Sequence, residues 1–158
     1  MSILVQGQAL PHFALPKTGG GLASPADYAG RQLVLFFYPK ADTSACTVES
    51  VDFTGLSPAF AAANTALLGI SADTLKKQEN FIRKHGLAVT LLSDQTHDLI
   101  DAFGIWVEKQ LYGRKYMGIE RTSVLIDAKG RIARIWTRVR VPGHALEVLA
   151  AAQALNNG

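Results

Sequence analysis

The chain has 158 residues, of which 48% are hydrophobic and 18% charged, and its formal net charge is +3. This composition excludes disordered and fibrous proteins, and the length predicts a single domain that spans residues 1–158. No stretch approaches the roughly 18 apolar residues of a membrane span and the first residues lack a secretory pattern, so we expect a cytoplasmic protein with no membrane partner.

The first strongly predicted element is a buried strand. The segment 32–39, QLVLFFYP, is almost continuously apolar and ends in proline, which is typical of a central strand. A helix should follow, with Thr43 or Ser44 as its cap and Cys46 in its first turn. Ser57 and Pro58 resemble a second helix start, so we expect this helix to be bent or split there.

Strands and helices then alternate to the end of the chain. We expect strands at 66–71 and 89–93, a helix over 75–85 that ends at Gly86, and a short helix at 97–104. Next, TSVLID and RIARIWTRV flank AKG as a hairpin, and a helix at 144–156 follows. The order β-α-β-α-β-α-β-β-α predicts an α/β fold, a thioredoxin-like three-layer sandwich with a central mixed, largely parallel sheet.

Basic residues are concentrated in the segment 108–140. Such a stripe can attract nucleic acid or anionic substrates. Here the charges are scattered among Tyr, Trp and Val, as on the solvated face of strands. We therefore expect no nucleic-acid partner.

Cys46 is the only cysteine, which excludes an internal disulfide and a cysteine-rich metal site. Most free cysteines are small buried hydrophobic residues. At a helix start, however, unpaired backbone N–H groups and the positive dipole end favour the reactive thiolate, and the preceding loop KADTSA is polar. We therefore expect Cys46 to be partly exposed and electropositive. Thr43 can cap the helix or direct its hydroxyl toward the sulfur, and Pro39 can shield the sulfur or simply end the strand.

The segment PKADTSAC fits the P-x-x-x-T-x-x-C signature of the peroxiredoxins. Further segments, in the right order and over nearly the whole chain, resemble their Q-type, or bacterioferritin-comigratory, branch: LVLFFYPKADTSACTVE, LLGISADT, QENFIRKHG, LLSD, YGRKYMGIERTSVLID and VPGHALEVL. The resemblance implies that Cys46 is the peroxidatic cysteine, with Thr43 and Pro39 as signature partners and Arg121 completing the site. One departure is TSAC, where the branch usually has TPGC.

The resemblance implies a thiol peroxidase that reduces hydrogen peroxide and small organic hydroperoxides. An arginine carries a permanent charge and several donors, so Arg121 can hold the sulfur anionic and bind peroxide oxygens; alternatively it is a solvated charge where a strand begins. Two other functions stay open, a peroxide-sensing redox relay and a non-catalytic thioredoxin-like binding module.

A second cysteine is missing from both places where Q-type proteins carry one, because this chain has Val51 and Ile82 there. We therefore expect a one-cysteine enzyme whose sulfenic acid is reduced by an external thiol, namely thioredoxin, glutaredoxin or glutathione. The resemblance also favours a monomer. The histidines lack metal-ligand spacing, and the glycines at 19–21 follow no predicted strand and open no helix, so we expect no metal and no cofactor.

Overall fold

The protein is described by a computed structural model that covers residues 3–158. A five-stranded sheet lies at its centre, in the order β5-β4-β3-β8-β9, and two two-stranded hairpins, β1-β2 and β6-β7, lie outside it. The strands are β1 (Leu15–Pro16), β2 (Leu22–Ala23), β3 (Gln32–Phe37), β4 (Thr65–Ser71), β5 (Thr90–Ser93), β6 (Trp106–Leu111), β7 (Arg114–Ile119), β8 (Thr122–Ile126) and β9 (Ile132–Trp136). The helices are η1 (Pro25–Tyr28), α1 (Ser44–Ala62), α2 (Leu75–His85), α3 (Asp98–Ala102) and α4 (His144–Asn157).

The sheet is mixed, with β3 at its centre. Leu35 of β3 lies opposite Leu68 in the parallel neighbour β4 and opposite Val124 in the antiparallel neighbour β8. The outer pairs follow the same division, since β4 and β5 are parallel whereas β8 and β9 are antiparallel. The α/β fold is as predicted, although the late hairpin makes half of the sheet antiparallel.

Two hydrophobic cores lie on opposite faces of this sheet. Side chains alternate between the faces of a strand, and all six residues of β3 are buried. Leu33, Leu35 and Phe37 therefore pack under α3 and the N-terminal segment, whereas Val34 and Phe36 pack under α1, α2 and α4. The three layers of the predicted sandwich are thus present, and Cys46 belongs to the second core.

Helix α2 begins and ends at the predicted signals. The Thr74 hydroxyl accepts a hydrogen bond from the backbone N–H of Lys77 at 3.2 Å, and Gly86 ends the helix with a φ of 60°. Within residues 3–158, no helix is both long enough and apolar enough to cross a membrane.

Helix α1 is continuous through Pro58, so of the expected bend or split the split is wrong. Proline lacks the N–H that would close one helical hydrogen bond. Phe53 and Phe60, on either side of Pro58, are both fully buried and their rings lie 5.8 Å apart. We attribute the continuity to this packing, which holds both halves of the helix against the sheet.

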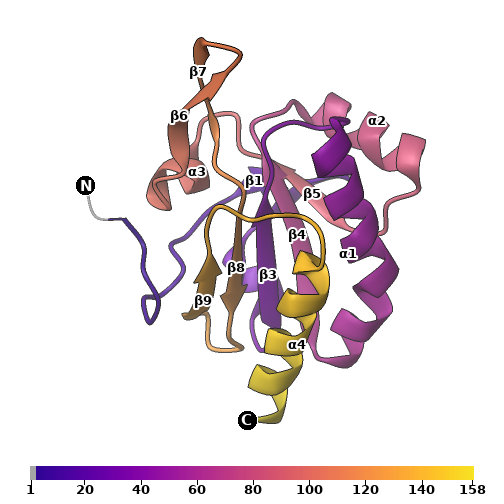
Figure 1. The fold of residues 1–158 in the computed structure, drawn as a ribbon. Coiled ribbons are helices and arrows are strands. Elements are labelled where there is room, and N and C mark those ends of the chain that lie inside the picture. The colour runs from indigo at the N-terminus through magenta and orange to yellow at the C-terminus, as the bar shows by residue number, and fades with distance from the viewer. Residues whose placement is uncertain (1–2) are drawn as a thin grey trace.

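The two outer hairpins were not predicted. The glycines at 19–21 do follow a strand, because they connect β1 to β2, and all three have positive φ angles. In β6-β7 the connecting residues Tyr112 and Gly113 have φ angles of 51° and 76°, as a tight two-residue turn requires. The second hairpin projects at the end of the molecule where α1 begins (Figure 1).

Candidate active site

Cys46 is the third residue of α1 and follows the loop that leaves β3. The backbone N–H groups of a first helical turn have no partner within the helix, and they point toward the helix start. The Cys46 side chain is 1% exposed, so the prediction of a partly exposed sulfur is wrong. The polar loop before it is exposed, but the side chain itself points inward and joins the core formed by α1, α2 and α4.

Arg121 brings a positive charge to this buried sulfur. It lies between β7 and β8, its side chain is 12% exposed, and its Nη2 donates to the Cys46 Sγ at 3.2 Å. Burial acts to lower the pKa of Arg121, but the charges of Glu49 and Cys46 outweigh it and the pKa is raised. The guanidinium is therefore cationic and contacts the thiol, and it is not a solvated surface charge.

Glu49 completes the contact and was missed from the sequence. Its Oε1 accepts a hydrogen bond from Arg121 Nη1 at 2.6 Å, and its Oε2 is buried without a hydrogen-bond partner within residues 3–158. Burial raises the pKa of Glu49 to about 7, against the lowering effect of Arg121. The signal for Glu49 was its position three residues after Cys46, which places both side chains on one face of the helix.

Thr43 and Pro39 lie in the loop between β3 and α1. Thr43 is the N-cap residue, yet its exposed hydroxyl neither caps the helix nor bonds to the sulfur; it donates to the Lys40 carbonyl at 2.8 Å. Pro39 is half-buried and follows Tyr38, directly after the central strand. Both residues therefore flank the site, but the two predicted orientations of the Thr43 hydroxyl are absent from this structure.

The same loop is fastened to α2. Asp42 has a φ of 62°, in the left-handed region, and its carboxylate contacts Lys84 at 2.7 Å and His85 at 2.8 Å. The hydrogen bonds from His85 and Lys84 are the main causes that lower the pKa of Asp42. One residue earlier, the Ala41 N–H donates to Asp73 Oδ2 at 2.8 Å. These contacts fix the path by which the chain enters the first turn of α1.

The positions that hold a second cysteine in Q-type proteins are both on helices. Val51 is 45% exposed on α1, and Ile82 is half-buried on α2. Since the chain contains a single cysteine, neither position can form a disulfide with it.

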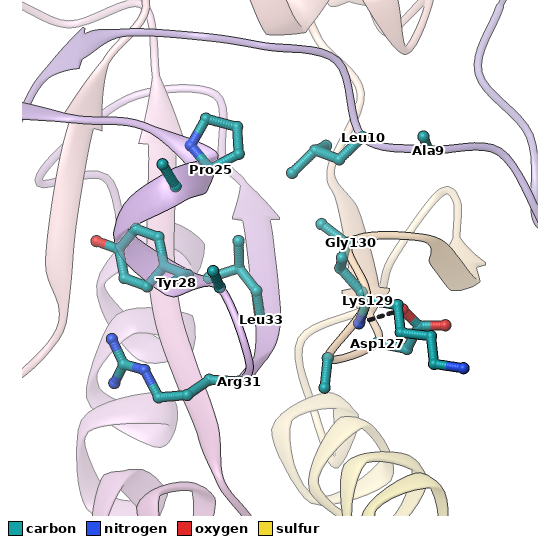
Figure 2. Close-up of a pocket in the computed structure, with 13 residues that line it drawn as sticks. Ala9, Leu10, Pro25, Tyr28, Arg31, Leu33, Asp127, Lys129 and Gly130 are labelled. Carbon is teal, nitrogen blue, oxygen red and sulfur yellow. Dashed lines mark hydrogen bonds between the residues drawn. The ribbon is translucent and has the colours of Figure 1, made fainter.

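A separate pocket of about 340 Å³ lies at the other end of the sheet, where β3 begins and β8 ends. Figure 2 shows Tyr28 and Arg31 on one side of it and Lys129 on the other, with the Lys129 N–H donating to Asp127 at 2.9 Å. It contains no thiol and is not part of the Cys46 site. Within residues 3–158, no group of three or more His, Cys, Asp or Glu side chains is placed to hold a metal ion.

Comparison with known proteins agrees with this geometry. The model of the AhpC/TSA family matches residues 6–135. The chain is 40% identical over 143 residues to peroxiredoxin Bcp of Bacillus subtilis, which covers 90% of this chain and 91% of that protein. A crystal structure of a PrxQ mutant from Xylella fastidiosa superposes with a TM-score of 0.91 at 37% identity, covering 98% of both chains.

A third relative is the bacterioferritin comigratory protein of Xanthomonas campestris, solved in a study of its alkyl peroxide reduction activity. It has a TM-score of 0.86 and 40% identity, and the match covers 91% of this chain and 92% of that one. These matches extend over almost the full length of the chain. The sequence segments that resemble Q-type peroxiredoxins are spread over the same length. The chain therefore belongs to the AhpC/TSA family, within the peroxiredoxins of the Bcp or Q type, and is a thiol-dependent peroxidase that lacks a resolving cysteine.

Proposed function

We propose that Cys46 is the peroxidatic residue and that it reduces hydrogen peroxide and small organic hydroperoxides. The thiolate attacks the terminal oxygen of ROOH, the O–O bond breaks, and RO⁻ takes a proton and leaves as ROH. The sulfur is oxidised to a sulfenic acid. The observation that supports this role is the 3.2 Å contact between Arg121 Nη2 and the Cys46 sulfur. Reduction of organic hydroperoxides is supported by the alkyl peroxide activity named for the Xanthomonas campestris relative.

Arg121 contributes more than ionisation of the thiol. An ordinary thiol of pKa about 8.5 is about 3% ionised at neutral pH, so complete ionisation accelerates the reaction by only about thirtyfold. The larger effect comes from donors aimed at the charge that moves onto the leaving oxygen. Glu49 holds Nη1 of the guanidinium, which leaves Nη2 directed at the sulfur and its reactant.

Thr43 and Pro39 have supporting roles in this proposal. In this proposal the exposed Thr43 side chain rotates, so that its hydroxyl leaves the Lys40 carbonyl and bonds to the bound peroxide. Pro39 shields the sulfur and fixes the start of the loop.

The sulfenic acid is reduced by an external thiol, which is thioredoxin, glutaredoxin or glutathione. Because the sulfur is 1% exposed, a bulky reductant reaches it only when the first turn of α1 opens. Opening breaks the contact of Cys46 with Arg121 and withdraws Cys46 from the second core, whereas the other residues of that turn are exposed or half-buried. We also propose that the protein acts as a monomer in the cytoplasm, where thiol reductants are abundant.

A stopped-flow experiment tests the assignment. Reduced protein mixed with one equivalent of hydrogen peroxide is expected to lose its thiol far faster than free cysteine does, and Cys46→Ser is expected to show no reaction. A rate equal to that of free cysteine would identify a non-catalytic binding module. Peroxide consumption with each reductant separates the enzyme from a redox relay, which oxidises once and does not turn over with any of them.

A further inference from the structure

Arg121 reaches the candidate active site from outside helix α1. Its guanidinium contacts Cys46 at 3.2 Å and Glu49 at 2.6 Å, and both of those residues belong to α1. The backbone of Arg121 lies directly before β8, a strand of the central sheet. The position of the guanidinium at the sulfur therefore depends on how β8 is held relative to α1.

Two residues after Arg121, a buried hydrogen bond joins β8 to α4. Ser123 Oγ and His144 Nε2 lie 2.7 Å apart. Ser123, the second residue of β8, is fully buried, and His144, the first residue of α4, is 7% exposed. In the sheet Ser123 lies opposite Trp136, which belongs to the same core as Cys46. The hydrogen bond is thus on the face of the sheet that Cys46 occupies.

The ring of His144 also packs against α1. It lies edge-on to the ring of Phe53, with 6.3 Å between the centroids, and edge-on to the ring of Trp136 at 5.9 Å. Phe53 is fully buried on α1, seven residues after Cys46, which is about two helical turns along the same face. His144 therefore contacts β8 through a ring nitrogen and α1 through its ring edge, and these are the two elements that Arg121 connects.

The connection from β9 to α4, residues 137–143, contacts Arg121 directly. The Val139 N–H donates a hydrogen bond to the Arg121 carbonyl at 3.0 Å. His144 follows this connection at once, so its bond to Ser123 fixes the far end of the same segment. The backbone of Arg121 and the side chain two residues later are thus both held by one short stretch of chain.

The His144 ring adds no charge to the site. Burial is the main cause that lowers its pKa; the charge of Glu147 raises the pKa, whereas the charge of Arg121 lowers it. A histidine whose pKa is lowered from its ordinary value of about 6.5 is neutral at pH 7. The effect of His144 on Cys46 therefore comes from the position that it gives to Arg121.

We propose that Ser123 and His144 are positioning residues of the peroxide reaction, whose hydrogen bond holds β8 against α1 so that the Arg121 guanidinium stays on the Cys46 sulfur. The inference rests on the proposed function, because it assumes that the reaction occurs at Cys46. A misplacement of about 1 Å in a reacting group can cost on the order of 10²-fold in rate. Loss of one hydrogen bond that sets this position should shift the guanidinium by less, and we expect about a tenfold loss.

The experiment removes the hydrogen bond from either side. Ser123→Ala deletes the hydroxyl, His144→Phe keeps an aromatic ring without a nitrogen, and His144→Gln keeps an amide that can bond to Ser123. The matched control is Thr65→Val. It removes another buried hydroxyl, which accepts a hydrogen bond from Gln32 Nε2 at 3.0 Å where β3 and β4 begin, at the end of the sheet away from Cys46. Stopped flow gives the second-order rate constant with hydrogen peroxide, and urea unfolding shows that each variant is folded.

Ser123→Ala and His144→Phe are each expected to lower this rate constant about tenfold, whereas His144→Gln and Thr65→Val should stay within about threefold of the unaltered protein. A double-mutant cycle tests whether the effect acts through the arginine. When Arg121→Met is already present, Ser123→Ala should change the rate constant less than about twofold, because the group that it positions is gone.

The inference is wrong if Ser123→Ala and His144→Phe keep the full rate, or if Thr65→Val slows the reaction as much as they do. It is equally wrong if His144→Gln is as slow as His144→Phe, or if Ser123→Ala has the same effect with and without Arg121. The unaltered protein keeps the two proposals apart. If it reacts with hydrogen peroxide no faster than free cysteine does, the role of Cys46 fails first.

Discussion

Replacement of Arg121 by methionine tests how the site works. Arg121→Met keeps an unbranched side chain but removes the donors to the Cys46 sulfur at 3.2 Å and to Glu49 at 2.6 Å. Loss of one donor aimed at developing transition-state charge typically slows catalysis by about 10²–10³-fold. We expect a loss of that size in the second-order rate constant with hydrogen peroxide.

The same change should also destabilise the fold, and the two effects must be separated. Glu49 and Cys46 are each 1% exposed, so Arg121→Met leaves a buried carboxylate without its cation. Removing one partner of a buried pair costs about 3–5 kcal/mol. The double variant Glu49→Gln/Arg121→Met makes the pair neutral, and it should recover most of this stability while the rate stays low.

The unaltered protein, Arg121→Met and the double variant are compared in two measurements. Stopped-flow thiol oxidation gives the rate constant with hydrogen peroxide, and urea unfolding gives the free energy of unfolding. If Arg121→Met reacts with peroxide within threefold of the unaltered protein, the guanidinium does not act on the reaction. If the double variant recovers the rate together with the stability, Arg121 has only a structural role.

Three further predictions concern other parts of the molecule. Burial raises the pKa of Glu49 to about 7 from an ordinary 4.5, so the folded protein keeps a proton that the unfolded chain releases. Stability from this group is therefore complete below pH 4.5 and decreases by about 3 kcal/mol as the pH rises to 7, and urea titrations should show that Glu49→Gln removes the decrease. Gly69→Ala would place a Cβ 2.6 Å from Leu91 Cδ2, and it should lower the free energy of unfolding by about 1–3 kcal/mol without changing the Cys46 oxidation rate. Thr43→Val should slow that oxidation at least about tenfold whereas Thr43→Ser should not, and equal rates in stopped flow would exclude the hydroxyl from the reaction.

The parts of the fold with local signals could be predicted from the sequence. Helix α2 has its cap at Thr74 and its end at Gly86, both within one turn of the helix that they delimit. Pro58 gave a local signal that the packing of α1 overrides. Hairpin β6-β7 mixes charged and apolar residues on both faces, so the alternation that normally indicates a strand was weak.

The candidate active site likewise combines features that the local sequence indicates with features that depend on tertiary packing. The position of Cys46 at a helix start follows from neighbouring residues, but the direction of its side chain depends on the core that α1 covers. The contact with Arg121 joins residues 75 positions apart, and only the resemblance to a family pointed to it. Glu49 lies three residues after Cys46 on the same face of the helix, but its contact with Arg121 depends on tertiary packing.

The central strand has a consequence for how the protein unfolds. Since alternate side chains of β3 belong to opposite cores, neither core can melt and leave the other intact. The amide protons of β3 should therefore exchange with deuterated solvent only when the entire molecule opens, in a single cooperative event. In the first turn of α1 only Cys46 belongs to these cores, so we expect that turn to open at a lower free energy than β3 does.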